Sequence, residues 1–312
     1  MHHRKTLPAA LGDHFALRDA TAAGVGKWRA SAPDLARPFN GVRAPAEPET
    51  FLQNVACYRP RMRPHHRLVG RSAMRVWGIP HPDPWQPESE KKPREPIEIA
   101  VPRNATPPRT VGVAGRRLNE DRASTWTVRG VRTVDPVAAL ITTAHELSLE
   151  AAVIAIDAII TRSLNYPGLE PGRPRVTRSE IAIRVDCWGW FTGRDTVRAA
   201  LALARDGVES PKETETRLML VRHGLPEPHV QHDVFDGHRR IARVDLAYPE
   251  AKIAIEYEGD AHRTSREQWR RDIQRQRELE ALGWIVIRLT QVDLDDPDAL
   301  ITRVRSALAS RR

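Results

Sequence analysis

Apolar positions in the last third of the chain recur at two spacings, one typical of helices and one typical of strands. Alternating stretches bounded by turn residues predict strands, and longer stretches with helical spacing predict helices. Gly283 is placed to end the longest of these helices. The predicted elements are a helix from Ser210 to His223, strands Arg239 to Ala247 and Ile253 to Glu258, a helix from Ser265 to Leu282, a strand from Trp284 to Leu289, and a helix from about Pro297 to Ala309.

The strand from Trp284 to Leu289 is apolar at almost every position. Such a run is typical of a strand covered on both faces, so we expect it at the centre of its sheet. Arg288 is the charged exception, and in a buried strand it needs a partner of opposite charge. An acidic residue of the preceding hairpin is the natural candidate. We expect Arg288 and Trp284 to support the structure around the site.

The N-terminal segment predicts two short helices around a glycine turn at residues 24–26, followed by a strand near Val42. This arrangement favours a winged helix-turn-helix, in which Lys27 and Arg29 would contact DNA. The alternative is a pair of short helices with no nucleic-acid role.

The middle of the chain predicts a mixed region of strands and helices. Helices are expected after Asp135, with proline in the first turn, and at Leu149 to Arg162, which is apolar on most sides. Residues 165–174 are rich in Gly and Pro and predict a linker. The predicted strands are Ile97 to Val101, Val111 to Leu118, and Thr125 to Val134 with a turn at Arg129 and Gly130.

The amino-acid composition indicates a net positive charge and a protein that works in a reducing compartment. The 312 residues include 49 Lys and Arg against 40 Asp and Glu, a net charge of +9, which suits a polyanionic partner or a generally basic surface. Two distant cysteines, Cys57 and Cys187, signal no disulfide framework. With no leader-like segment and no apolar stretch long enough for a bilayer, we expect a cytoplasmic protein without membrane contact.

Residues 50–82 carry six arginines and no acidic residue. Such a run favours a surface that faces phosphates, whereas a solvated basic surface is the alternative. We expect Arg59, Arg61 and Arg63 to bind nucleic acid.

Carboxylates on the predicted hairpin form the strongest candidate site. A four-residue loop at 249–252 would place Asp245 directly opposite Glu256, on the face that Glu258 shares. Opposed carboxylates repel each other, and a hard divalent cation removes that cost. The alternative is the ordinary solvent face of an amphipathic hairpin.

Neighbouring residues strengthen the metal hypothesis, and each has an alternative role. Glu213 could approach the same edge, or it could complete a capping box with Ser210. His262 could act in catalysis or bond a loop carbonyl. Asp272 could pair with Arg275 or Gln276 along its helix. The arginines expected to meet phosphates are Arg266, Arg270, Arg271, Arg275 and Arg277.

These residues resemble a known family. The segments SPKETETRLMLVRHGLPEP, RVDLAYPEAKIAIEYEGDAH and RRDIQRQRELEALGWIVIRLT, from Ser210 to about Leu294, are similar to the Vsr-like domain of unknown function in the PD-(D/E)XK endonuclease superfamily. The resemblance implies an αβββαβ core with a central mixed sheet flanked by helices. It also implies a Mg²⁺ (or Mn²⁺) site at Asp245, Glu256 and Glu213, with His262 as the family's histidine. Glu258 stands where the superfamily usually has lysine.

The front of the chain more loosely resembles the antitoxin of abortive-infection type IV toxin–antitoxin systems. The similar segments lie around Phe15 to Val25, Gly41 to Arg43, Ser72 to Pro80 and Gly130 to Pro136. This resemblance implies a winged-helix transcriptional regulator and a cognate toxin or a second copy of the chain as partner.

The resulting fold class is α/β, with an α+β front and a restriction-endonuclease-like back. The predicted domains are residues 1–48, winged-helix-like; 49–165, an antitoxin-like α/β domain; 166–208, a linker and connecting helix; and 209–312, the endonuclease domain.

Two functions remain open. The first is a divalent-metal-dependent endodeoxyribonuclease in which Glu258 orients the attacking water and His262 assists proton transfer. The second is a DNA-binding, antitoxin-like regulator whose nuclease fold is inert. DNA is the expected partner in both, and RNA is not excluded.

Overall fold

The computed structural model describes residues 6–81, 95–259 and 266–311, and the chain forms two compact units. The first contains residues 1–145 and 172–174, and the second contains residues 146–171 and 175–312. Both combine helices with sheets, so the predicted α/β class is confirmed at that level. The division between the units falls inside the predicted 49–165 domain, while the finer four-part division stays a prediction.

In residues 6–48 the structure describes a 3-10 turn, two short α-helices and a two-stranded sheet. Apolar side chains of this segment, Phe15, Ala20, Ala30 and Leu35, pack into a small core of their own. The second helix has only four residues, about 6 Å of helix, and the winged-helix interpretation is not confirmed. The elements are β1 (Phe15–Ala16), α1 (Leu17–Ala22), α2 (Lys27–Ala30) and β2 (Val42–Arg43).

The rest of the first unit is built on a mixed six-stranded sheet in the order β5-β6-β4-β3-β8-β7. Arg129 and Gly130 both have positive φ, 49° and 76°, as the tight β7–β8 hairpin requires. The elements are α3 (Phe51–Tyr58), β3 (Arg67–Leu68), α4 (Gly70–Trp77), β4 (Ile97–Val101), β5 (Arg109–Thr110), β6 (Val113–Arg117), β7 (Thr125–Val128), β8 (Val131–Val134) and α5 (Pro136–Thr143).

The second unit begins with helix α6 (Leu149–Ile160), which is buried along almost its whole length. The segment predicted as a linker and connecting helix contains two helices, α7 (Arg178–Trp188) and α8 (Arg194–Leu203), and α8 packs against α6. None of the helices that the structure describes combines the length and apolar character needed to cross a membrane.

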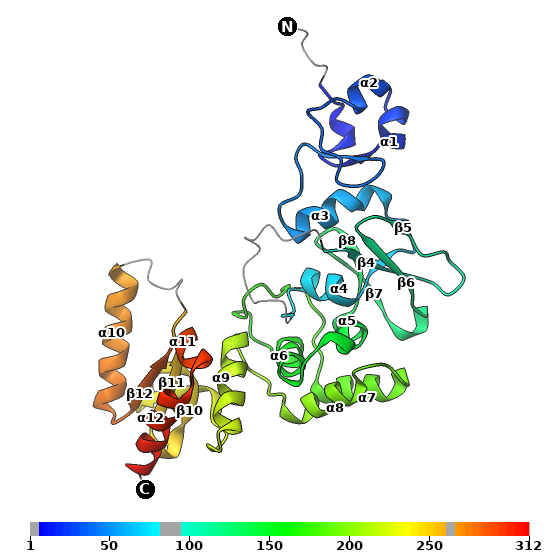
Figure 1. The fold of residues 1–312 in the computed structure, drawn as a ribbon. Coiled ribbons are helices and arrows are strands. Elements are labelled where there is room, and N and C mark those ends of the chain that lie inside the picture. The colour runs from blue at the N-terminus through cyan, green and yellow to red at the C-terminus, as the bar shows by residue number, and fades with distance from the viewer. Residues whose placement is uncertain (1–5, 82–94, 260–265, 312) are drawn as a thin grey trace. The chain divides into compact units, whose positions relative to one another are not determined.

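A four-stranded mixed sheet forms the centre of the second unit, in the order β12-β11-β10-β9. Helices α9 and α12 cover one face through an aliphatic core, and α10 covers the other through Leu279 (Figure 1). The elements are α9 (Pro211–Arg222), β9 (His229–Asp236), β10 (Arg239–Tyr248), β11 (Ile253–Tyr257), α10 (Arg266–Ala281), β12 (Ile285–Leu289), α11 (Gln291–Asp295) and α12 (Asp298–Ala309).

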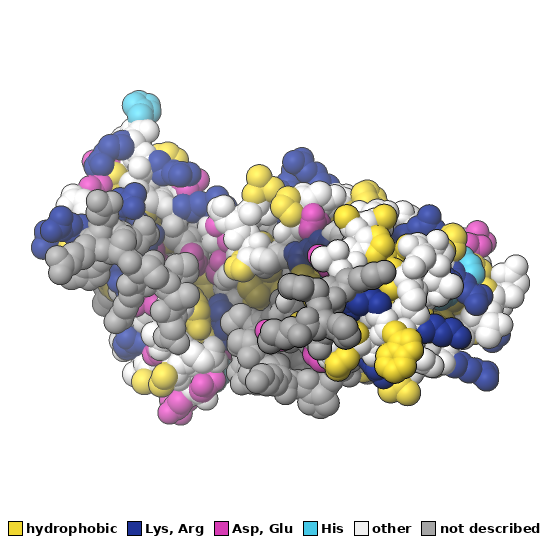
Figure 2. Space-filling model, turned by 90° about the horizontal axis from the view of Figure 1, so that it is seen from above, with side chains coloured by type: hydrophobic (Ala, Val, Ile, Leu, Met, Phe, Trp, Pro, Cys, Tyr) yellow, Lys and Arg dark blue, Asp and Glu magenta, His cyan; other side chains and the backbone are white. Residues whose placement is uncertain are grey.

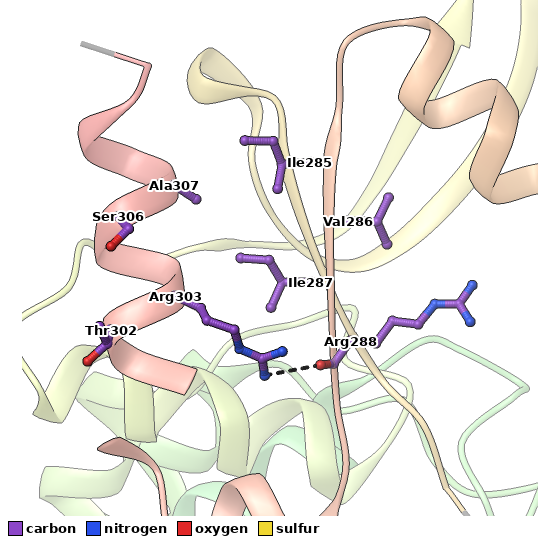
Figure 3. Close-up of a pocket in the computed structure, with 8 residues that line it drawn as sticks. All are labelled: Ile285, Val286, Ile287, Arg288, Thr302, Arg303, Ser306 and Ala307. Atoms are coloured by element: carbon purple, nitrogen blue, oxygen red, sulfur yellow. Dashed lines mark hydrogen bonds between the residues drawn. The ribbon is translucent and has the colours of Figure 1, made fainter. Parts of the chain in front are cut away.

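The prediction that the apolar strand is central is wrong for the described sheet, because β12 is an edge strand. Ile285 and Ile287 point toward α12, whereas Val286 and Arg288 point the other way (Figure 3). The open side of this strand borders a groove of about 540 Å³ against α12. An apolar run indicates that helices cover both faces, but strand neighbours are set by backbone pairing, which leaves no mark in the hydrophobic pattern.

Candidate active site

Polar residues from all four strands lie in one row across the sheet of the second unit. Leu246 pairs with Ile255, so the next pair along the hairpin is Asp245 with Glu256, as predicted. On the other side of β10 the flanking pairs place Gln231 opposite Asp245. Glu256 pairs with Arg288 on β12. Paired residues share a face, so the row brings two acids together on the side covered by α10.

Burial sets the charge properties of the two hairpin acids. Asp245 Oδ2 accepts a hydrogen bond from Tyr257 N at 3.1 Å, and burial raises the pKa of Asp245 although this bond lowers it. Glu256 is 6% exposed, and burial raises its pKa against the opposing charge of Arg275. Arg275 Nη2 donates to Glu256 Oε2 at 2.9 Å. Glu256 Oε1 is buried and has no hydrogen-bond partner among the described residues.

Glu213, in the first turn of α9, joins this acidic cluster. Ser210 caps the helix by accepting from Glu213 N, but the Glu213 side chain does not return the bond that a capping box needs. Glu213 Oε2 accepts instead from Glu209 N at 3.0 Å and from Gln231 Nε2 at 2.8 Å. Burial, and then the nearby charge of Asp245, raise the pKa of Glu213 to about 7.

The structure says less about the catalytic roles predicted for Glu258 and His262. Glu258 Oε1 accepts from Arg288 Nη1 at 2.5 Å, so Arg288 has the acidic partner expected of it and Glu258 is engaged. The role of Glu258 in orienting water stays a prediction. His262 lies outside the described residues, as does the side chain of Arg266.

The predicted supporting residues separate into two groups. Trp284 is buried in the core beneath α10, with its ring 5.7 Å from that of His232. Asp272 is half-buried on α10, and Arg275 bonds Glu256 across the helix–sheet interface. The ion pair that the structure shows for Arg275 is therefore with Glu256 and not with Asp272 along the helix.

The predicted nucleic-acid-binding residues are partly exposed and partly engaged inside the protein. Arg270, Arg271 and Arg277 are exposed on α10. On the face shown in Figure 2, basic side chains are interspersed with acidic and apolar ones. In the first unit Lys27, Arg59 and Arg63 are exposed, whereas Arg29 pairs with Asp34 and Arg61 donates to the Asn40 carbonyl.

Part of the basic run at 50–82 serves the fold. Arg67 is 5% exposed and donates to the Ala123 carbonyl at 2.9 Å. Arg71 and Arg75 both pair with Glu95. A continuous phosphate-facing surface along this segment is therefore too broad an expectation, because these three guanidinium groups already have partners.

The acidic cluster offers oxygen atoms of the kind that bind divalent cations. Carboxylate oxygens are the ligands that Mg²⁺ prefers, and Glu256 Oε1 is available in a buried position. In the described part of the chain no three carboxylate, imidazole or thiol groups converge closely enough to bind one ion. The carboxylates of Asp245, Glu256 and Glu213 are the right kind of donor for such an ion, but they would have to move closer together. Glu256 Oε2, which Arg275 holds, would have to turn toward the ion.

Gln231 is a site residue that the sequence analysis missed. It lies on β9, for which no strand bounds were predicted, and its amide donates to Glu213 and lowers the pKa of the neighbouring Asp245. Nothing in the local pattern distinguishes this glutamine from a surface residue, because its partners come from α9 and β10 and meet only in the folded chain.

Replacing Glu213 with glutamine is expected to stabilise the protein at alkaline pH. The folded-state pKa of Glu213 is raised from 4.5 to about 7, so the folded state binds more protons than the unfolded state between these values. The free energy of unfolding therefore falls as the pH rises through this window, by up to about 3 kcal/mol. Glu213→Gln removes this loss, so the gain should be present at pH 8 and absent at pH 4.

Hydrogen exchange of the α9 amides measures this effect locally, which is needed because the chain has two compact units. Glu250→Gln, at an exposed position in the hairpin loop, is the matched control and should show no such dependence. An equal gain at pH 4 and pH 8 would contradict the raised pKa.

Comparisons with known proteins show what this chain is similar to. A restriction-endonuclease-like family model, REase_MTES_1575, matches residues 219–308, which include Asp245, Glu256 and Glu258 but not Glu213. The C-terminal part of the chain is therefore restriction-endonuclease-like. Two curated Mycobacterium tuberculosis proteins, the uncharacterized proteins Rv2248 and MT2308, are each 29% identical over 186 residues, or 59% of this chain. The match spans 65% of the length of those relatives.

A solved structure also shows a partial likeness. The RV2827C protein from Mycobacterium tuberculosis has a TM-score of 0.37 and 14% sequence identity, over 75% of this chain and 90% of that one. At this TM-score the likeness supports no argument about fold or function.

Proposed function

We propose that the second unit is a divalent-metal-dependent endonuclease that hydrolyses phosphodiester bonds in DNA. The observation that supports this most is that Asp245 and Glu256 lie opposite each other in the restriction-endonuclease-like segment, with Glu213 nearby, and that each of the three has a raised pKa. Carboxylates that repel one another in a buried site are stabilised by a cation, and perturbed pKa values cluster at functional sites.

In this proposal Asp245, Glu256 and Glu213 hold a Mg²⁺ or Mn²⁺ ion. The ion would polarise the phosphodiester and lower the pKa of a bound water. Arg275, which now pairs with Glu256, lies where it can neutralise a phosphate once the carboxylate is turned toward a cation. Exposed Arg270 and Arg277 on the same helix would contact the DNA backbone.

A plasmid nicking assay with the full chain tests the proposal. We expect conversion of supercoiled DNA to the open circle with Mg²⁺ or Mn²⁺, and no conversion with EDTA. Ca²⁺, which prefers larger and more flexible coordination, should support binding with much slower cleavage. Cleavage that persists at the same rate in EDTA, or no cleavage with any of the metals, would contradict it.

The second candidate is a DNA-binding regulator with an inert nuclease fold. It is favoured by the ion pairs of Arg275 with Glu256 and of Arg288 with Glu258, which neutralise the acids without any metal. This protein would bind DNA equally well in EDTA, with an affinity that falls steeply with salt. Filter binding of a labelled duplex in EDTA at 50 and 200 mM salt, beside the nicking assay, separates the two.

A further inference from the structure

Gln231 has a backbone conformation that is unusual for a strand residue. Its φ is +50°, in the left-handed region that non-glycine residues rarely adopt. The other described non-glycine residues with positive φ, Arg129 and Lys252, lie in turns between strands, whereas Gln231 lies within β9. Strain of this kind persists only where the surrounding structure compensates, and it is concentrated at functional sites.

The side chain of Gln231 connects two acids that come from different elements. Its Nε2 donates to Glu213 Oε2 on α9 at 2.8 Å. The same side chain lies near enough to Asp245 on β10 to lower the pKa of that carboxyl. The strand register places Gln231 directly opposite Asp245. A primary amide has two N–H donors, so one glutamine can bond two carboxylates at once.

This contact explains why the strained backbone is retained. Glu213 and Asp245 repel each other, since the charge of Asp245 contributes to the raised pKa of Glu213. A neutral double donor between them offsets that repulsion without adding a charge. An extended conformation at residue 231 would direct the side chain along the regular alternation of β9, whereas the left-handed conformation changes its direction.

We propose that Gln231 is a positioning residue, which holds Glu213 on α9 and Asp245 on β10 close enough together to share one divalent cation. This inference rests on the proposed nuclease function and adds to it a residue that supports the ligands without being one. Groups that orient metal ligands through hydrogen bonds typically change metal affinity by about 10- to 100-fold when they are removed.

Gln231→Gly separates this role from a merely structural one. Glycine adopts positive φ without strain, and this relief opposes the loss of the hydrogen bond to Glu213, so the variant should still fold, which thermal unfolding checks. Glycine has no side-chain amide, so we expect Mn²⁺ to bind more weakly. The dissociation constant, measured by titration of the full chain without DNA, should rise about 10- to 100-fold. In the nicking assay the Mn²⁺ concentration for half-maximal rate should rise in parallel, with a smaller change in the rate at saturating Mn²⁺.

Two further variants complete the experiment. Lys252→Gly relieves the same backbone conformation in the hairpin loop, where Lys252 Nζ bonds the Leu282 carbonyl, and should leave Mn²⁺ affinity unchanged. Gln231→Asn keeps an amide on a residue that tolerates the left-handed region, but its side chain is too short to reach both carboxylates. This variant should also weaken Mn²⁺ binding, so it provides the same measurement if the glycine variant folds poorly.

The outcomes are distinguishable. Equal Mn²⁺ affinity in the wild type and both Gln231 variants, with nicking intact, overturns the positioning role and leaves the nuclease proposal standing. A wild-type chain that neither binds Mn²⁺ nor nicks DNA overturns the nuclease proposal and the positioning role together. Weaker affinity with retained thermal stability supports the role.

Discussion

Replacing Asp245 with asparagine is expected to reduce metal-dependent DNA nicking by at least about 10³-fold. A catalytic metal contributes several kcal/mol of transition-state stabilisation, and each 1.4 kcal/mol corresponds to about one factor of ten in rate. Asparagine has the same shape, and its amide oxygen can still accept the hydrogen bond from Tyr257 N. The variant therefore tests the loss of the carboxylate with little change in the hairpin.

Initial nicking rates with saturating Mg²⁺ or Mn²⁺ measure this effect. Glu250→Gln is the matched control, because Glu250 is an exposed carboxylate in the loop of the same hairpin. It should nick DNA at the wild-type rate. If Asp245→Asn retained that rate as well, the cluster would not be the catalytic centre, even if the protein still proved to be a nuclease.

Replacing Asp157 with alanine is expected to destabilise the second unit by about 3 to 5 kcal/mol. Asp157 is fully buried on α6, where Oδ2 accepts from Arg217 Nη2 at 3.2 Å and from Thr214 Oγ1 at 2.8 Å. Its Oδ1 accepts from Arg205 N at 2.7 Å. Removal of the carboxylate leaves the 1% exposed Arg217 with Glu227 as its remaining partner and leaves two other donors unsatisfied.

Burial raises the pKa of Asp157 to about 6, so the comparison belongs at pH 7.5, where the carboxylate is ionised. Urea unfolding combined with hydrogen exchange of the α6 and α9 amides reports on the second unit specifically. The double variant Asp157→Leu with Arg217→Met should recover part of the loss, since it removes the buried guanidinium charge that has lost a partner. The recovery is partial because the Arg205 amide and the Thr214 hydroxyl still lack their acceptor. Asp157→Ala with wild-type exchange in α9 would show that the pair does not join the two helices.

The Asp157–Arg217 ion pair also helps to position the acidic cluster. Thr214 and Arg217 follow Glu213 on α9, so the bonds from α6 hold the helix that presents the cluster's third acid. Residue 157 lies outside both the predicted 209–312 domain and the 219–308 family match. A fragment beginning near residue 209 would therefore expose Arg217 without its buried partner.

The hairpin was the part of the site best predicted from the sequence. Alternation of apolar and polar residues in β10 and β11 located both strands, and the four residues after Tyr248 set the register in which Asp245 faces Glu256. Both signals are local, because the side-chain period of a strand and the length of a short loop are properties of neighbouring residues. The partner of Arg288 was predicted for a related reason, since a charge in an apolar strand needs a nearby counter-charge.

Other features depended on contacts that no local pattern records. The sequence left Glu213 between a capping role and a metal role, and the structure connects its side chain to Glu209 and Gln231. The apolar run predicts a central strand, but β12 lies at the edge of the described sheet. Six arginines in one segment predicted a phosphate-facing surface, yet three of them already have partners inside the protein.

Local patterns in the sequence were enough to predict the α/β class, most of the helices and strands, and the pair of opposed carboxylates, because hydrophobic periodicity and turn length act over a few residues. The folded chain was needed to show that Glu213 of α9 lies near that pair, that β12 is the edge strand, and that Gln231 bonds Glu213. These features depend on packing between segments that are distant in the chain. The energy of such packing cannot be inferred from the residue pattern of any single segment.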